Sequence, residues 1–206
     1  MHLLSLSLCV LRHPVSCFRI IQQDRKHFSF WPAIILYAML VAVRLIFLQT
    51  VHYPLQTTDP RYANWIMECA MLLLPLLSLA VCAFAISSIM DGEMMMRESL
   101  TAVAYSMMPC IVFFLPLSLL SHLLSRGDAL FSLIYMGLWL WSFVLYFISF
   151  KVMNSYTFGK TLLTLVLTVL LIALLWAVIL LLYALWNQLL SFVVGLYREI
   201  KFIVRR

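Results

Sequence analysis

The sequence predicts an all-α polytopic membrane protein: a bundle of five transmembrane helices with an interfacial amphipathic helix at each end. The residues from Thr161 to Tyr197 include no Asp, Glu, Lys or Arg, and about 20 apolar residues already suffice to cross a bilayer. Four further long apolar stretches precede this one. Hydrophobic residues make up 65% of the chain and charged residues 11%, whereas soluble domains average roughly 45–50% and 25%.

The apolar stretches place the five spans at residues 30–51, 66–90, 99–124 and 129–150 and in the segment that begins at Thr161. No Gly, Pro, Asn or Asp lies between Thr161 and Trp186, so a hairpin turn there would lack the usual turn residues. One long helix is favoured, and a hairpin remains the alternative. A single helix of this length would reach roughly 55 Å, beyond the ~30 Å hydrocarbon core. We therefore expect the surplus to bend onto the membrane surface near Asn187, Gln188 or Gly195.

Both ends of the chain have an amphipathic pattern, which divides it into segments 1–29, 30–186 and 187–206. Between Pro14 and His27, an apolar patch of Cys17, Phe18, Ile20 and Ile21 alternates with polar residues, which favours an interfacial helix over a basic tail without structure. In the last segment, apolar residues occupy one helical face, and four cations are expected to contact anionic headgroups or a partner protein: Arg198, Lys201, Arg205 and Arg206.

The net charge of +6 indicates contact with anionic lipids rather than nucleic acid, because most basic residues flank the spans. If the N-terminus is cytoplasmic, the cytoplasmic side has seven cations: Arg12, Arg19, Arg25, Lys26, Arg97, Lys151 and Lys160. The other side then has two before the tail, Arg61 and Arg126, and six with it. Without the tail, the positive-inside rule favours a cytoplasmic N-terminus.

Arg44 is the most informative residue within a span. A charged side chain at mid-helix costs about 2.5–3.5 kcal/mol on insertion scales, so such residues usually have a partner. Glu68 lies near the start of the second span, toward the same side of the membrane. We expect an Arg44–Glu68 ion pair that locks the first two spans together. Snorkelling of Arg44 to the headgroups and a substrate or ion site are the alternatives.

The sequence offers no constellation typical of an enzyme, a metal site or a cofactor site. Asp91-Gly92-Glu93 is interpreted as a turn in which Gly92 takes a positive φ and Asp91 caps the next helix. The histidines are scattered without ligand spacing. The five cysteines lack paired spacing, so they are interpreted as small core residues or bystanders rather than disulfides or zinc ligands: Cys9, Cys17, Cys69, Cys82 and Cys110.

Two ordered stretches of this chain resemble the bacterial members of the Yip family, relatives of the Ypt/Rab-interacting membrane proteins. The first contains His13 and Pro14 ahead of the span with Arg44. The second runs from Asp91-Gly92-Glu93 into a helix with Tyr105 and Pro109. The resemblance implies five spans, a bacterial plasma membrane location and a non-enzymatic role in organising membrane proteins. Some bacterial relatives accompany carbohydrate ABC transporters, which suggests an accessory subunit. The long polar N-terminus of the eukaryotic members is missing, which puts Rab binding in doubt.

Three functions therefore compete. The first is a scaffold or accessory subunit bound to other integral membrane proteins. The second is a small permease or channel for a solute or lipid, although the later spans offer few polar residues to line a path. An interfacial enzyme acting through Asp91, Glu93 and His13 ranks last. The sequence leaves the oligomeric state open.

Overall fold

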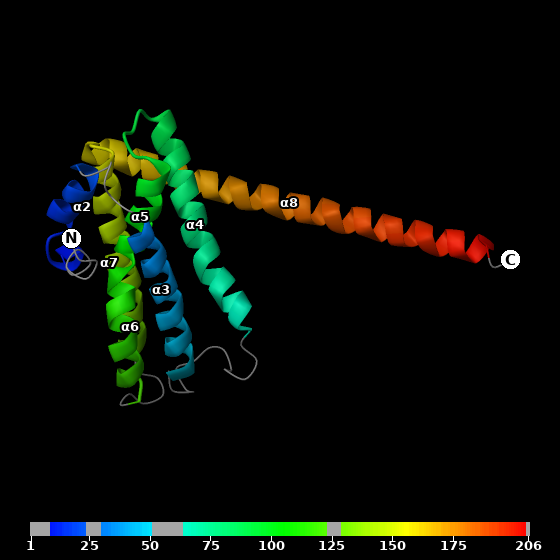
Figure 1. Ribbon diagram of the computed structural model, residues 1–206, viewed down its shortest axis with the longest axis horizontal. Helices are drawn as coiled ribbons and strands as arrows, with labels where there is room; N and C mark the ends of the chain where they lie inside the picture. Colours follow the sequence, from blue (N-terminus) through cyan, green and yellow to red (C-terminus); the bar gives the residue numbers. More distant parts are fainter. Residues whose placement is uncertain (1–8, 24–29, 51–63, 123–128, 205–206) are drawn as a thin grey trace.

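The structure is a computed structural model that describes residues 9–23, 30–50, 64–122 and 129–204, and every regular element in these residues is a helix (Figure 1). The helices, in chain order, are α2 (Pro14–Gln23), α3 (Trp31–Thr50), α4 (Trp65–Ile89), α5 (Met96–Ser106), α6 (Met108–Leu120), α7 (Ala129–Met153) and α8 (Phe158–Val204). Five helical segments are long and apolar enough to cross a membrane, with α5 and α6 together forming the third. The predicted all-α, five-span architecture is confirmed.

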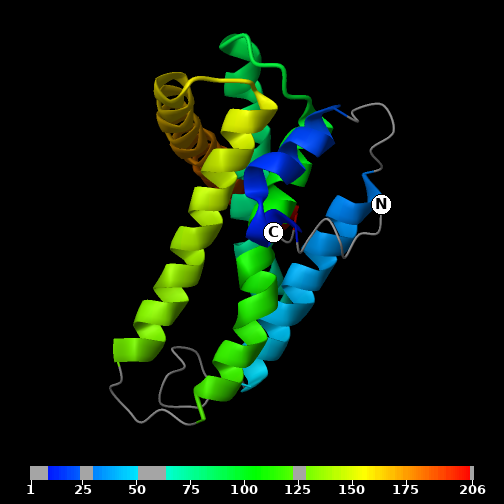
Figure 2. The ribbon, with the colours of Figure 1, turned by 90° about the vertical axis from the view of Figure 1, so that its left-hand side faces the viewer.

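Helix α5 is the centre of the bundle and contacts α3, α4 and α7 (Figure 2). All residues from 101 to 110 are buried. Its small and hydroxylated side chains let neighbouring backbones approach closely and hydrogen-bond to them, as is common between membrane helices. Ser99 Oγ donates to the Ala80 carbonyl of α4 at 2.6 Å. Tyr37 of α3 donates to the Leu100 carbonyl at 3.0 Å.

The third span is divided at Met107, whereas the sequence predicted one helix over 99–124. Pro109 has no N–H to donate to the carbonyl four residues earlier, and its ring restricts the residue before it. Met107 N–H bonds instead to the Ala104 carbonyl, at 3.2 Å. Pro109 then occupies the first turn of α6, where a missing N–H is tolerated. Pro75 and Pro116, by contrast, lie inside continuous helices.

Helix α8 is one continuous helix, so the prediction of a single helix rather than a hairpin is confirmed. Only its first turns are anchored: Thr161, Thr164 and Thr168 are fully buried, and Leu165 is 7% exposed. From there α8 crosses α4 and extends away from the bundle (Figure 1). The predicted bend at 187–195 is wrong, because the helix runs through these residues unbroken. An isolated Gly costs about 1 kcal/mol in a helix and does not by itself end one.

The predicted N-terminal helix is present as α2, but its apolar side packs against α7. Cys17, Phe18 and Ile21 are at most 1% exposed, whereas Ile20 is 37% exposed. Gln22 Nε2 donates to Ser155 Oγ at 2.9 Å, which places α2 at the end of the bundle where α7 passes into α8. The structure describes two of the four predicted tail cations. Arg198 and Lys201 belong to α8, and Arg205 and Arg206 lie outside the described residues.

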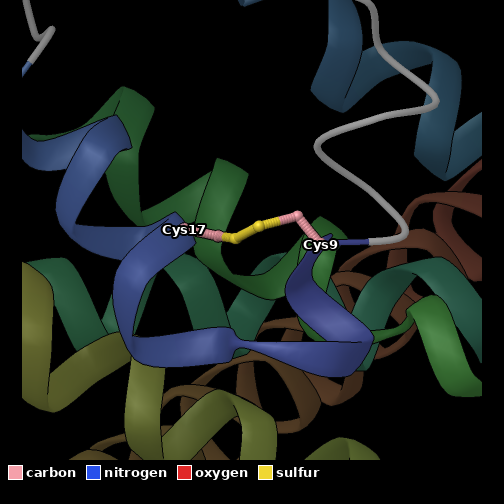
Figure 3. Close-up of a disulfide and its surroundings, with 2 residues drawn as sticks. All are labelled: Cys9 and Cys17. Carbon is pink, nitrogen blue, oxygen red and sulfur yellow. A yellow bond between two sulfur atoms is a disulfide. The ribbon is translucent and has the colours of Figure 1, made fainter.

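Cys9 and Cys17 form a disulfide, which corrects the interpretation of all five cysteines as unpaired (Figure 3). Residues 9–12 form a helical turn, and the helix breaks at His13 before α2 begins. This break brings the two Cα atoms to 6.3 Å, within the range that a disulfide bridges. Spacing along the sequence did not reveal the pair because the reversal of the chain at His13 creates it.

Candidate functional site

Arg44 joins three helices of the bundle. One of its terminal nitrogens lies 4.0 Å from Glu68 Oε2 on α4, so the predicted ion pair is present, with its two atoms at the outer limit of such contacts. The other nitrogen donates to the Tyr135 hydroxyl on α7 at 3.3 Å. The Arg44 and Glu68 side chains are 22% and 20% exposed. The sequence predicted Glu68 as a partner of Arg44 but did not indicate Tyr135, because that contact depends on how α7 lies beside α3.

Aromatic rings surround this charge. The guanidinium carbon of Arg44 lies 5.8 Å from the centre of the Phe47 ring, within the range of a cation–π interaction. Phe47 packs in turn against Phe114, Phe131 and Tyr135, with ring centres 5.0–6.4 Å apart. Residues 131 and 135 share one face of α7, since they are four positions apart. The arrangement holds a cation in a largely apolar setting and couples α3, α4, α6 and α7.

The second candidate region, here called the helix-end junction, comprises the ends of α4 and α7 and the loops that follow them. Asp91 has φ 52° and Ser155 has φ 54°, the left-handed conformation that often closes a helix. Gly92 N–H bonds to the Ser87 carbonyl at 2.8 Å, and Tyr156 N–H bonds to the Lys151 carbonyl at 3.1 Å. Both helices therefore end in the same six-residue closing motif.

Two predictions about the Asp91-Gly92-Glu93 turn are wrong. Asp91, not Gly92, takes the positive φ, because an Asp side chain tolerates this conformation better than most. Asp91 also does not cap the next helix. The first residue outside α5 is Met95, whose N–H donates to the Glu98 carboxylate at 2.9 Å, and this carboxylate serves as the reciprocal half of a capping box.

Gly92 is required by close packing rather than by its backbone angles. A Cβ atom at this position would collide with Ser87, Asn154 and Tyr156. These three residues form the buried side of the junction. Ser87 Oγ donates to Asn154 Oδ1 at 2.6 Å, and the Tyr156 hydroxyl donates to the Met90 carbonyl at 3.0 Å. Tyr156 thus supplies a donor to the Met90 carbonyl at the end of α4, and the junction ties the two helix ends together.

Tyr156 remains a hydrogen-bond donor at neutral pH. Burial raises the pKa of its hydroxyl, the hydrogen bond with Ser87 lowers it, and the negative charge of Asp91 raises it, with a net increase. Lys160 lies over the Tyr156 ring, with its ammonium nitrogen 4.4 Å from the ring centre. The Tyr156 hydroxyl therefore stays protonated and able to donate at physiological pH.

The remaining predicted residues do not converge on a reaction centre. Asp91 and Glu93 are exposed on the loop, and His13 is exposed at the N-terminal break beside the half-buried Pro14. Tyr105 is fully buried in α5. Across the described ranges, no group of three or more His, Cys, Asp or Glu side chains is placed to hold a metal ion.

The helices, the membrane-embedded Arg44 and the closed helix-end junction define a five-span α-helical multi-pass membrane protein. The chain belongs to the Yip1 domain family, because the sequence model of the Yip1 domain matches residues 8–181. The predicted resemblance is thereby confirmed at the level of the family. The match includes both motif stretches and ends within α8, before the tail cations. No curated protein and no solved structure matches the chain.

Proposed function

We propose that this Yip1-domain protein is a non-enzymatic scaffold or accessory subunit that binds another integral membrane protein along α8. The supporting observation is the exposure of this helix. Only 11% of the most apolar part of Phe158–Gly195 is buried, compared with 67% for Met96–Leu120. From residue 169 to residue 195, no described side chain is buried. The other described residues leave this surface uncovered.

The length of α8 also favours a protein partner. The 38 residues of Phe158–Gly195 correspond to roughly 57 Å of helix, against a hydrocarbon thickness of about 30 Å. A lone helix of this length must tilt strongly or deform the bilayer. Packing against neighbouring helices is what normally sets such a tilt.

The base of α8 is suited to hold a partner at a fixed position. Its buried threonines fix it against α4, and the helix-end junction fixes the loop that precedes it. An apolar groove of about 290 Å³ lies between α4, α7 and α8, lined by residues that include Leu79, Phe147 and Val166. A partner helix that runs alongside α8 would reach this groove close to the bundle.

Within the scaffold proposal, the partner class is the membrane subunits of a carbohydrate ABC transporter in a bacterial plasma membrane. This finer assignment is supported by the likeness to bacterial family members. It requires no catalytic or metal-binding residues in the chain itself.

Site-specific photo-crosslinking tests the proposal. Photoreactive residues replace Leu174 and Leu181 on α8, which are 61% and 59% exposed. Matched controls replace Ile35 and Met39 on α3, which are exposed to 47% and 43%. We expect the α8 positions, and not the α3 positions, to crosslink to one recurring multi-pass protein identified by mass spectrometry. Lipid adducts alone at both helices would contradict the scaffold. Solute or lipid transport by the purified protein in vesicles would favour the permease instead.

A further inference from the structure

The Cys9–Cys17 disulfide joins the N-terminal turn to α2 (Figure 3). Its two ends differ in access, because Cys17 is fully buried and Cys9 is half-buried. Val10 in the turn and Phe18 in α2 are also fully buried. The disulfide therefore connects two segments that pack into one apolar cluster.

Helix α2 leads from this disulfide to the end of the bundle for which the sequence predicts a cytoplasmic location (Figures 1 and 2). Gln22 near the end of α2 contacts Ser155, so the end of α2 and the α7–α8 loop share that end of the bundle. The basic residues favour the cytoplasm for that end by seven to two, the tail excluded. Cytoplasmic thiols are kept reduced, and disulfides in that compartment are usually transient, catalytic or redox-sensing.

We propose that Cys9 and Cys17 are a reversible redox-modification site that holds the N-terminal turn on α2 when oxidised and releases it when reduced. The proposal combines the disulfide with the predicted cytoplasmic location of the bundle end to which α2 leads. A permanent disulfide would be expected only if that end faced an oxidising compartment.

The reaction is thiol–disulfide exchange with a cellular dithiol or glutathione. A thiolate of the reductant attacks Cys9 Sγ, since Cys17 is inaccessible. The Cys9–Cys17 bond breaks, its electron pair goes to Cys17 Sγ, and that sulfur takes up a proton. A second thiolate then displaces the Cys9 thiol from the mixed disulfide, so the reductant leaves as a disulfide. Two electrons and two protons enter the protein, and an oxidised thiol reverses the sequence.

Reduction should release the turn without unfolding the bundle. Helix α2 is held independently by the buried Phe18 and Ile21 and by the Gln22–Ser155 hydrogen bond. Residues 9–12 are held by the disulfide to α2 and by their own apolar packing. Among the described contacts, none is a hydrogen bond from these residues to α7. Release would expose part of the apolar cluster to which Val10 and Phe18 belong.

The redox state can be read directly, because Arg12 lies between the two cysteines and Arg19 follows them. Cells are treated with diamide, with dithiothreitol or with neither, and thiols are then trapped by acid and alkylation. Trypsin leaves residues 1–12 and 13–19 joined only where the disulfide exists. We expect the linked fraction to rise severalfold with diamide and to fall severalfold with dithiothreitol. Full linkage under all conditions would overturn the proposal and place the N-terminus on the oxidising side. An absence of linkage even with diamide would overturn it as well.

Limited trypsin cleavage of the folded protein in native membranes tests the release. Arg12 and Arg19 are both exposed. We expect reduction to accelerate cleavage after Arg12 severalfold and to leave cleavage after Arg19 unchanged. Cys9→Ser should show the fast rate in both redox states. The matched control Cys69→Ser changes an unpaired, half-buried cysteine of α4 and should keep the redox response. Equal Arg12 cleavage in oxidised, reduced and Cys9→Ser protein would overturn the release.

Discussion

At the scale of single residues, two positions are constrained by what surrounds them. Arg44 is a cation inside a span that contacts a carboxylate, a phenol and an aromatic ring. Gly92 is the residue at which the helix-end junction admits no side chain. In both cases some of the neighbours come from distant parts of the chain, so a substitution changes the packing between elements as well as local structure.

Arg44→Leu is expected to destabilise the protein by about 1–3 kcal/mol, because it leaves the Glu68 carboxylate without its charged partner in a partly buried site. Arg44→Lys retains the charge and should cost less. The double variant Arg44→Leu, Glu68→Leu should recover part of the loss. Thermal unfolding in mild detergent measures all three. Strictly additive losses in the double variant would contradict the ion pair.

Gly92→Ala is expected to destabilise the helix-end junction by about 1–3 kcal/mol, the usual range for an overpacked site. The added Cβ would push apart Ser87, Asn154 and Tyr156. Gly137→Ala on α7 is the matched control, because a Cβ there meets nothing within 4 Å. Detergent melting of the two variants provides the comparison. Equal stability of Gly92→Ala and the unmodified protein would show that the junction adapts.

At the scale of helices, the chain uses one interrupted helix and one unusually long helix. Helix α5 is short, polar on several sides and buried from residue 101 to its end, and the break at Met107 separates it from the apolar α6. Helix α8 has the opposite character, since it is continuous, apolar and largely uncovered. Helix α5 stabilises the bundle from inside, whereas α8 is the surface to which the proposed partner would bind.

The tail cations are expected to bind anionic lipid. Replacing Arg198, Lys201, Arg205 and Arg206 by Gln should weaken binding to vesicles that contain phosphatidylglycerol, since each cation contributes on the order of 1 kcal/mol near an anionic surface. The bundle should melt at an unchanged temperature, because the tail lies beyond the buried base of α8. Vesicle flotation at two salt concentrations measures the effect. Binding that is unaffected by the four substitutions would remove the lipid role of the tail.

At the scale of the whole molecule, two of the described connections and the N-terminal helix meet at one end of the bundle. The α4–α5 loop, the α7–α8 loop and α2 are linked there by the contacts of Tyr156 and Gln22. The start of α4 lies at the other end (Figure 1). This separation follows because α4 runs from one end of the bundle to the other, and it makes the predicted orientation testable with two labels (Figure 1).

Cysteine labelling should place Glu93 in the cytoplasm and Asn64 outside it. Both residues are exposed and lie at opposite ends of α4 and its following loop. Glu93→Cys and Asn64→Cys are each introduced into a cysteine-free background and treated with a membrane-impermeant maleimide. In intact cells we expect labelling of Asn64→Cys only, and in inverted vesicles of Glu93→Cys only. The reverse pattern would invert the topology and remove the cytoplasmic argument for the redox pair.

The amino-acid sequence alone was enough to identify the membrane environment and the five spans. Uninterrupted apolar runs are sufficient to identify spans, because a bilayer requires every crossing segment to satisfy its own backbone hydrogen bonds. The continuity of α8 was also predictable, because no turn residues interrupt its apolar stretch between Thr161 and Trp186. The Arg44–Glu68 pair was also within reach, because charges within spans are rare and few partners were available.

Which sides of the helices meet became clear only once their packing was known. Tyr135 joins Arg44, Cys9 joins Cys17, and Tyr156 closes the end of α4, and each contact depends on packing or chain reversal rather than on spacing. Sequence patterns also misplaced the positive φ at Gly92 and the bend in α8, because backbone preferences at single residues are weak compared with packing and helix continuation. In a membrane, apolar patterning marks all sides of a helix alike, so which side contacts a neighbour is settled by the fit of its side chains.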